Sequence, residues 1–242
     1  MKKIAVIGAG IAGTTTAYAL LKRGHKVTIF DYRRYPAMAT SYANGGQLSA
    51  SNAETWNTTK NVISGIKWMF KPDAPLLFNP SPEIQKYKWM LGFLFATIKG
   101  EHKKNTLETI DLAKKAREIY FKIADEEGIE FELLKKGILR FYDSEKEFKL
   151  DRAKASWLDQ EGMEWDILTT EEVKSLEPAF ENNKNYEKIL GGIYTKSDAS
   201  GDIHKFCTSL EQVLVDKYSA NLQLNTTVEH ITRQKDQLVL TM

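Results

Sequence analysis

The first residues whose types and spacing suggest chemistry are three glycines near the N-terminus. Gly8, Gly10 and Gly13 follow an apolar run, KKIAVI, and open a segment rich in alanine and leucine. In the pattern G-x-G-x-x-G, the first glycine permits a tight turn and the second lets the backbone approach a pyrophosphate, while the third lets a helix pack closely on a strand. The N-terminus of such a helix favours an anion. The spacing therefore predicts a dinucleotide-binding loop.

An acidic residue completes this fingerprint. Asp31 ends a second apolar run, KVTIFD, at the position where a carboxylate binds the hydroxyls of the adenosine ribose. The alternative is a glycine-rich turn and a surface aspartate. Because a strand, a turn, a helix and an acidic residue coincide here, we favour the nucleotide site. The fingerprint alone does not distinguish NAD from FAD.

The elements that must position these residues follow from the hydrophobic pattern. We expect a strand at 2–7, a helix at 14–24 and a strand at 26–31, which together form a βαβ unit with a parallel sheet. A long helix is expected over 105–129, with Gly128 as its stop signal. The other expected elements are a strand at 137–142, a helix ending at Gly162, a short helix from Thr170 to Pro178, a strand and a loop at the start of 190–206, a helix at 202–218, and β runs at 221–226, 227–234 and 237–242.

Composition excludes several classes of protein. The 242 residues suffice for one large domain or two interleaved smaller ones, and 42% hydrophobic and 27% charged residues are typical of soluble globular proteins. A formal charge of +2, with lysine and glutamate interspersed, does not favour nucleic acid as a partner. Cys207 is the one cysteine, which we interpret as a buried small hydrophobic residue; no metal site is expected, and a cytoplasmic location fits best.

The segment ATSYANGGQLS (39–49), which follows TIFDYRRYP, resembles the flavin-contacting loop of the D-amino-acid dehydrogenase family. That family belongs to the wider group that contains glycine, sarcosine and D-amino-acid oxidases. The resemblance continues in GIKWMFKPDAPLLFNP, YKWMLGFL, GGIYTKSDASGDIHKF and LNTTVEHI, at 65–80, 87–94, 191–206 and 224–231. It thus extends over nearly the whole chain.

The resemblance implies FAD as the cofactor and an α/β fold. The expected architecture is a Rossmann-like FAD-binding domain, a parallel sheet flanked by helices, interleaved with part of an α+β substrate domain. The FAD-binding domain would comprise 1–55, 100–130 and 198–242, and the substrate domain 56–99 and 131–197. Family members are longer than this chain, which ends in an apolar run. We therefore expect an N-terminal part of a larger enzyme, with the C-terminal part missing.

Carried over residue by residue, the resemblance also implies a set of cofactor-binding residues. The glycine loop and Asp31 would hold the ADP half of FAD, Thr40 and Ser41 the pyrophosphate, and the segment 44–48 the isoalloxazine ring. Gly45 stands where the family commonly has alanine, a mild departure. The full set is Ile7, Gly8, Ala9, Gly10, Ile11, Ala12, Gly13, Asp31, Tyr32, Arg33, Arg34, Thr40, Ser41, Asn44, Gly45, Gly46, Gln47, Leu48 and Val228, the last through its backbone at the adenine.

The reaction that the resemblance implies is oxidative deamination of a D-amino acid. A hydride would pass from Cα to the flavin, the imino acid would hydrolyse to a 2-oxo acid and ammonia, and the electrons would reach a quinone or another respiratory-chain acceptor. The flavin does this chemistry, and the protein positions it. We nominate no catalytic side chain. The four histidines, His25, His102, His204 and His230, are expected in surface roles.

Three alternatives remain open from the residues. One is a glycine- or sarcosine-type amine oxidase with oxygen as acceptor. Another is a catalytically silent FAD-binding subunit that works with a separate C-terminal polypeptide. The third is an NAD-dependent dehydrogenase.

The aromatic segment 87–98 has two interpretations. Trp89, Leu91, Phe93 and Phe95 are expected to pack in the core of the substrate domain, because aromatic residues at such spacing are usually core. The alternative is an amphipathic segment that binds peripherally to the inner face of the cell membrane. No segment approaches the roughly 18 apolar residues of a membrane-spanning helix.

Overall fold

The computed structural model describes residues 1–69, 71, 73–74, 78–180, 188–235 and 237–242. Part of the segment 65–80, on which the resemblance partly rests, therefore lies outside the described residues. Contacts among the described residues divide the chain into two compact units built from interleaved segments. Unit 1 comprises Met1–Leu48, Glu118–Lys136 and Ala199–Met242, and unit 2 comprises Ser49–Arg117 and Gly137–Asp198.

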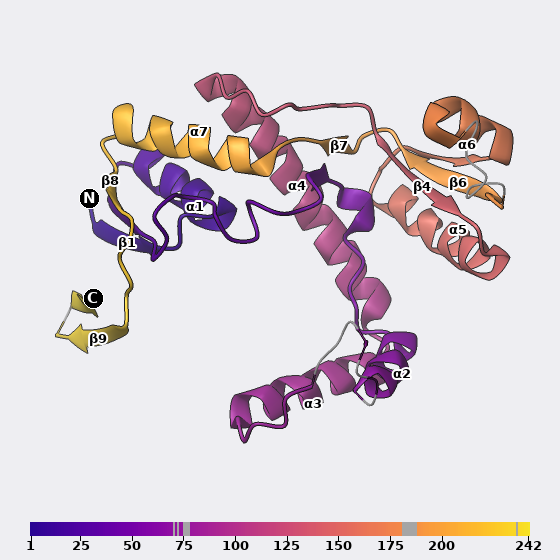
Figure 1. Ribbon diagram of the computed structural model, residues 1–242, viewed down its shortest axis with the longest axis horizontal. Coiled ribbons are helices and arrows are strands. Elements are labelled where there is room, and N and C mark those ends of the chain that lie inside the picture. Colours follow the sequence, from indigo (N-terminus) through magenta and orange to yellow (C-terminus); the bar gives the residue numbers. More distant parts are fainter. Residues whose placement is uncertain (70, 72, 75–77, 181–187, 236) are drawn as a thin grey trace. The chain divides into compact units, whose positions relative to one another are not determined.

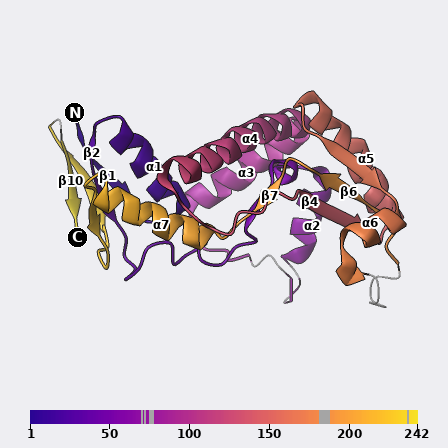
Figure 2. The same cartoon turned by 90° about the horizontal axis from the view of Figure 1, so that it is seen from above.

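Unit 1 is built on a parallel sheet whose described strands lie in the order β1, β2, β8. Strand β1 (Lys3–Ile7) pairs with β2 (Lys26–Phe30), which in turn pairs with β8 (Asn221–Gln223). Helix α1 (Ile11–Lys22) makes the crossover from β1 to β2, and α7 (Ile203–Asp216) lies beside α1 (Figures 1 and 2). The predicted βαβ unit and its parallel sheet are confirmed.

The core of unit 1 is explained by the spacing of apolar residues on α7. Phe206, Leu210 and Leu214 recur every four residues and so share one face of the helix, and all three are fully buried. They pack in one cluster with residues of α1, β1 and β2. Cys207, on the same helix, is also fully buried, as predicted.

The predicted helix ends are only partly right. Helix α1 begins at Ile11 rather than at Thr14, because the last residues of the glycine pattern already form its first turn. Helix α4 (His102–Glu127) begins three residues before the predicted start at 105. It ends before Gly128, as predicted, where a φ of 66° terminates the helix. Its first part belongs to unit 2 and its last part to unit 1.

Unit 2 is built on an antiparallel sheet in which β6 (Gly191–Thr195) lies between β4 (Ile138–Tyr142) and β5 (Trp165–Leu168). Helices α5 (Glu145–Gln160) and α6 (Thr170–Leu176) accompany this sheet (Figure 1). Strand β5 was not predicted, because WDIL is short and contains a charged residue.

Helix α6 begins at Thr170, as predicted. Its N-cap is Thr169, whose hydroxyl accepts a hydrogen bond from the Glu172 amide at 3.3 Å. The Glu172 carboxylate in turn accepts from the Thr169 amide at 2.8 Å. This reciprocal capping box satisfies two amides that the helix itself leaves free.

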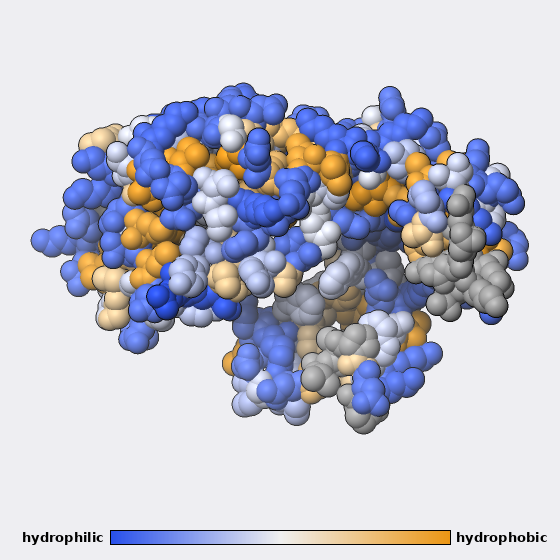
Figure 3. Space-filling view, turned by 45° about the horizontal axis from the view of Figure 1, so that its top comes forward, coloured by the Kyte–Doolittle hydropathy of each residue, from blue (hydrophilic) through white to orange (hydrophobic). Residues whose placement is uncertain are grey.

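Two helices of unit 2, α2 (Thr59–Trp68) and α3 (Ile84–Ile98), correct the interpretation of the aromatic segment. Within the described part of the chain α3 has no buried residue, and Trp89, Leu91 and Phe95 are 67%, 53% and 59% exposed. The prediction that these side chains form core is wrong here. The reason is that apolar residues occur all round α3, so no single layer covers them. Figure 3 shows hydrophobic residues at the surface among hydrophilic ones.

The remaining elements are short. Strand β3 (Gln47–Leu48) pairs antiparallel with β7 (Ala199–Ser200), and β9 (His230–Gln234) pairs antiparallel with β10 (Gln237–Thr241). The predicted β runs near the C-terminus are therefore present, although β9 begins later than predicted. Single 3-10 turns cover Ala50–Asn52 and Pro178–Phe180. Among the described helices, none has the length and hydropathy needed to cross a membrane.

Candidate functional site

The glycine loop between β1 and α1 requires glycine at two positions for reasons of backbone geometry. Gly8 has a φ of 104°, and its amide donates to the Phe30 carbonyl at 2.7 Å. A Cβ at Gly13 would lie 1.8 Å from the Gly8 carbonyl oxygen. Helix α1 therefore approaches the end of β1 only because residue 13 has no side chain, as the fingerprint predicts.

The N-terminus of α1 has the features of an anion site. Its N-cap is Gly10, which has no side chain of its own to cap the helix, and no acidic residue occupies the first turn. The Ile11 amide donates to Ser41 Oγ at 3.0 Å, and the first backbone bond of the helix runs from Thr14 to the Gly10 carbonyl. The amides of the first turn thus lack partners inside the helix, and a bound phosphate would satisfy them.

Asp31 lies at the end of β2, and its carboxylate joins the strand to the glycine loop. Oδ2 accepts from the Ala9 amide at 2.7 Å, and Oδ1 accepts from the Arg33 amide at 2.8 Å. A carboxylate has about four lone-pair positions, so both oxygens keep capacity for the ribose hydroxyls.

The backbone carbonyls of Asp31 and Arg33 contact the segment that follows β8. The Thr226 amide donates to the Asp31 carbonyl at 2.9 Å, and the Asn225 amide donates to the Arg33 carbonyl at 2.9 Å. Val228 follows two residues later.

The Arg33 guanidinium lies over the Tyr32 ring, and its Nε is enclosed without a partner in the described structure. An enclosed N–H group without an acceptor, in the unit that also contains the open N-terminus of α1, fits an anionic cofactor such as FAD.

The loop after Asp31 is held mainly by Asn44. Its Nδ2 donates to the Ser41 carbonyl at 3.0 Å, and its Oδ1 accepts from the Gly46 amide at 2.7 Å. The Asn44 side chain is thus engaged by the loop itself. Thr40 is exposed, whereas Ser41 is buried under the first turn of α1.

The two adjacent glycines of this loop have different requirements. Gly46 has a φ of 60°, and a Cβ there would lie 2.8 Å from the carbonyl oxygen of Gly201. The Gly201 amide also donates to the Gly46 carbonyl at 2.8 Å. At Gly45 a Cβ would meet only Gln47 Cγ at 3.9 Å, an ordinary contact. Alanine is therefore compatible with the backbone at position 45 but not at position 46.

The structure brings some of the predicted residues together and leaves others apart. The glycine loop, Asp31 and Ser41 are joined by direct hydrogen bonds. The side chains of Tyr32, Arg34 and Thr40 are exposed and make no described hydrogen bond to the glycine loop.

Cys207 lies near Ser41 and Thr14. Burial raises the pKa of its thiol to about 11 against the opposing effect of these two hydroxyls, so the thiol stays protonated at neutral pH.

Sequence reasoning missed the role of Ala37. This buried residue has a φ of 57°, and its amide donates to the Ala9 carbonyl at 3.0 Å. His204 Nδ1 lies 3.4 Å from the Ala37 carbonyl, and the His204 ring packs edge-on against Tyr42. The preceding Pro36 was the one available signal of a turn. His204 is therefore partly buried and contacts this loop through its imidazole, rather than standing free at the surface.

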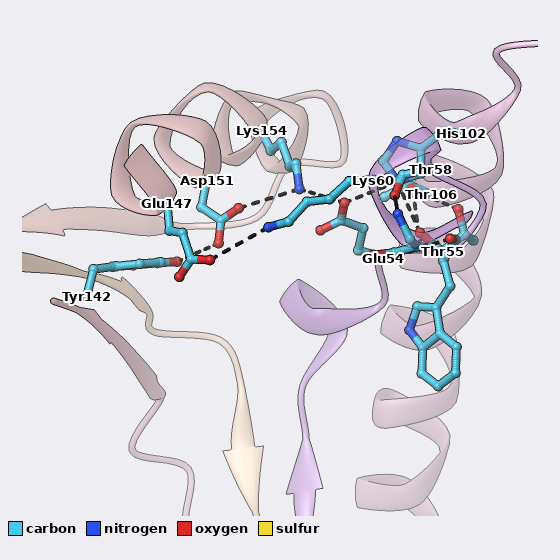
Figure 4. A network of polar contacts seen from close by, with 12 residues as sticks. Glu54, Thr55, Thr58, Lys60, His102, Thr106, Tyr142, Glu147, Asp151 and Lys154 are labelled. Carbon is cyan, nitrogen blue, oxygen red and sulfur yellow. Dashed lines mark hydrogen bonds and ion pairs between the residues drawn. The ribbon is translucent and has the colours of Figure 1, made fainter. Parts of the chain in front are cut away.

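A second polar cluster belongs to unit 2 (Figure 4). Glu54 Oε1 accepts from Lys154 Nζ at 2.7 Å and lies 3.1 Å from His102 Nε2, and the His102 side chain is 18% exposed. The Tyr142 hydroxyl donates to Asp151 Oδ2 at 3.1 Å, and burial raises the pKa of Tyr142 to about 12. A cavity of about 30 Å³ borders the cluster, which is room for water rather than for a substrate. The arrangement is that of a structural network.

Among the described residues, no group of three histidine, cysteine, aspartate or glutamate side chains is placed to bind a metal ion. The groups described at the glycine loop are backbone amides, hydroxyls and one carboxylate, which are able to bind a nucleotide and an anion.

Comparison with known proteins identifies the family. The family model described as FAD dependent oxidoreductase matches residues 3–241. The chain belongs to this family. The predicted cofactor, FAD, is confirmed, and so is the resemblance on which that prediction was based.

Two relatives are similar over almost the whole chain. D-amino acid dehydrogenase 3 of Mesorhizobium japonicum is 46% identical over 97% of this chain and 55% of its own length. D-amino acid dehydrogenase of Dechloromonas aromatica is 31% identical over 98% of this chain and 56% of its own length. The chain thus spans about half the length of the curated relatives it matches.

Solved structures support the α/β fold. Glycine oxidase from Geobacillus kaustophilus superposes with a TM-score of 0.69 at 20% identity, over 98% of this chain and 50% of the other. L-proline dehydrogenase from P. horikoshii gives a TM-score of 0.66 at 18% identity, over 98% and 47%. At such identities the likeness concerns the fold alone, and the roles of single residues stay predictions.

Proposed function

We propose that this chain carries the FAD-binding part of a D-amino acid dehydrogenase. The enzyme would deaminate a D-amino acid to a 2-oxo acid and ammonia and pass the electrons to a respiratory-chain acceptor. The observation that carries the proposal is the glycine loop, whose Ala9 and Ile11 amides are tied to Asp31 and Ser41 around an open helix N-terminus. It occurs in a chain that is 46% identical to a D-amino acid dehydrogenase.

The proposed roles follow from the chemistry of each group. The first-turn amides of α1 and the hydroxyls of Thr40 and Ser41 would bind the pyrophosphate, and Asp31 the ribose hydroxyls. Arg33 would place its enclosed Nε–H group toward a phosphate. The segment 44–48 would lie along the isoalloxazine ring. We assign FAD binding to the segments 1–55, 100–130 and 198–242 and substrate binding to 56–99 and 131–197.

When bound, FAD supplies the acceptor for the electron pair that leaves the substrate. The described residues bind and orient it. We assign no side chain as a general acid or base.

The test begins with binding and then adds substrate. The purified chain is titrated with FAD and followed by visible absorbance, and D-alanine is then added without oxygen, with L-alanine as the control. Loss of flavin absorbance with D-alanine alone supports the proposal. Loss that requires an added polypeptide matching the remaining half of the relatives supports the silent-subunit alternative. Peroxide formation in air without reduction of a quinone-like dye supports the amine-oxidase alternative.

We further propose that α3 binds peripherally to the inner face of the cell membrane. Trp89, Leu91 and Phe95 are exposed on a helix that also carries the exposed Lys88 and is followed by the exposed Lys99 at its C-cap. Exposed aromatic and aliphatic residues beside lysines are typical of helices that lie in the membrane interface.

Sedimentation with vesicles containing anionic lipid tests the membrane proposal. We expect the double variant Trp89→Glu/Phe95→Glu to stay in the supernatant while the parent chain pellets with the vesicles. Trp56→Glu is the matched control, because Trp56 is 78% exposed in the same unit but lies outside α3. Equal sedimentation of all three proteins contradicts the proposal.

A further inference from the structure

Asp198 has a buried carboxylate that the proposed cofactor site does not use. It is 0% exposed and accepts four hydrogen bonds from described residues of unit 2. Oδ2 accepts from Ser49 Oγ at 2.8 Å and from Ser51 Oγ at 2.5 Å. Oδ1 accepts from the Ala50 amide at 3.0 Å and from Arg117 Nη1 at 2.7 Å. The carboxylate therefore has no lone pair left for a ligand.

The partner cation is also buried. The Arg117 side chain is 9% exposed and makes a further contact, at 3.5 Å, with Ser197 Oγ. A buried ion pair contributes little net stability, because desolvation of the two charges offsets most of their attraction. Its better-attested use is to specify one arrangement of the chain. The arrangement that this pair specifies follows from its position in the chain.

Asp198 and its partners at 49–51 lie at the ends of two short paired strands, β3 and β7. Ser49 follows β3 directly, and Asp198 directly precedes β7. The two strands have only two residues each, with Gln47 opposite Ser200 and Leu48 opposite Ala199. Such a short ladder is marginal on its own, and a slip of one residue would exchange the faces of Gln47 and Leu48. Hydrogen bonds from 49–51 to Asp198 continue the pairing beyond the ladder and prevent the slip.

We propose that Asp198 is a positioning residue for the loop 44–48. Together with Arg117 it holds the register of β3 on β7, so that Leu48 stays in the core and Gln47 stays exposed. The inference rests on the proposed function in one respect: the loop 44–48 is where the flavin ring would lie. Loss of the carboxylate would then loosen the wall of the ring site without removing any group that contacts FAD.

The test uses a variant that avoids an unpaired buried charge. In Asp198→Asn the serine hydroxyls can reverse and accept from the new amide, but Arg117 would remain buried without a counter-charge. The double variant Asp198→Asn/Arg117→Met removes that charge. We expect amide hydrogen exchange in 45–51 and 199–201 to become about tenfold faster and the Kd for FAD to rise about tenfold.

The matched control is Glu127→Gln. The Glu127 side chain is 2% exposed and accepts from Tyr18, Lys217 and Tyr218, but it is distant in sequence from the loop. At a similar loss of Tm, this variant should leave exchange in 45–51 and the Kd for FAD unchanged. If the double variant does not fold, Ser51→Ala keeps the ion pair and removes one hydroxyl. It should give the same local increase in exchange to a smaller extent.

The outcomes separate this inference from the proposed function. Exchange in 45–51 that is unchanged in the double variant, or that rises equally in Glu127→Gln, overturns the positioning role. Faster exchange at an unchanged Kd for FAD overturns the link to the flavin. If the parent chain does not bind FAD, the proposed function fails, while the exchange comparison still decides whether Asp198 holds the register.

Discussion

Asp31 and Asp198 are two aspartates whose surroundings differ in one instructive respect. Asp31 is held by two backbone amides and keeps lone pairs free. Asp198 is fully buried and is saturated by two hydroxyls, an amide and a guanidinium. The comparison teaches that spare hydrogen-bonding capacity, rather than burial or charge, distinguishes a carboxylate that can bind a ligand from one that holds the chain.

The largest loss of stability is expected when the Asp198 carboxylate is replaced while Arg117 is kept. Asp198→Asn leaves Arg117 buried without a counter-charge, which should cost about 3–5 kcal/mol of the free energy of unfolding. Urea denaturation of the purified chain measures it. A loss below about 1 kcal/mol would contradict the view of Asp198 as a structural carboxylate.

The glycine loop should respond next most strongly. Gly13→Ala forces a Cβ to within 1.8 Å of the Gly8 carbonyl oxygen, so α1 must move away from β1. We expect a loss of about 1–3 kcal/mol in stability and of measurable FAD binding. Gly92→Ala is the control, since a Cβ there meets nothing within 4 Å, and it should bind FAD as the parent chain does.

Replacement of Asp31 should lower the affinity for FAD more than the stability of the fold, the reverse of what is expected for Asp198. Asp31→Asn keeps one acceptor oxygen but places an amide group opposite the Ala9 or Arg33 N–H. We expect FAD affinity to fall by about 1–3 kcal/mol, with a smaller change in the free energy of unfolding. Isothermal titration with FAD and urea denaturation of the same sample give the two values. A variant that loses stability but not affinity would place Asp31 in the structural class.

A third carboxylate extends the comparison to pH. Burial acts to raise the pKa of Glu127, but hydrogen bonds from Lys217, Tyr218 and Tyr18 outweigh it and lower the pKa below its usual value. Its contribution to stability is therefore full above the unfolded pKa, about 4.3, and is lost as the pH falls through the folded pKa. Thermal unfolding of the parent chain between pH 3 and 6 should show this loss, and Glu127→Gln should reduce it.

The smallest change in stability is expected at Gly45, the first of the two adjacent glycines. Gly45→Ala should change stability by less than about 0.5 kcal/mol, because the nearest atom to its Cβ is 3.9 Å away. Gly46→Ala should be clearly worse, since its φ is 60° and the Gly201 carbonyl lies 2.8 Å from the new Cβ. Thermal unfolding of the two variants tests this order.

How much could be predicted from the sequence depends on how local each feature is. The βαβ unit, the glycine loop and the helix at 202–218 were predicted, because each follows from short-range spacing. The cap of α6 and strand β5 were not, since two adjacent threonines compete for one cap and WDIL is a weak strand signal. The exposure of α3 was mispredicted, because apolar composition does not reveal what covers a helix.

The sequence by itself determined the nucleotide loop and the parallel sheet, whereas FAD as the cofactor was implied by the resemblance to a known family. The physical reason is that the requirements of Gly8, Gly13 and Asp31 are met within one βαβ unit. Only the tertiary structure decided that Asn44 is engaged by its own loop and that Asp198 is saturated. The Asp198 contact joins residues 148 positions apart, so it depends on which distant segments pack together, and no local pattern encodes it.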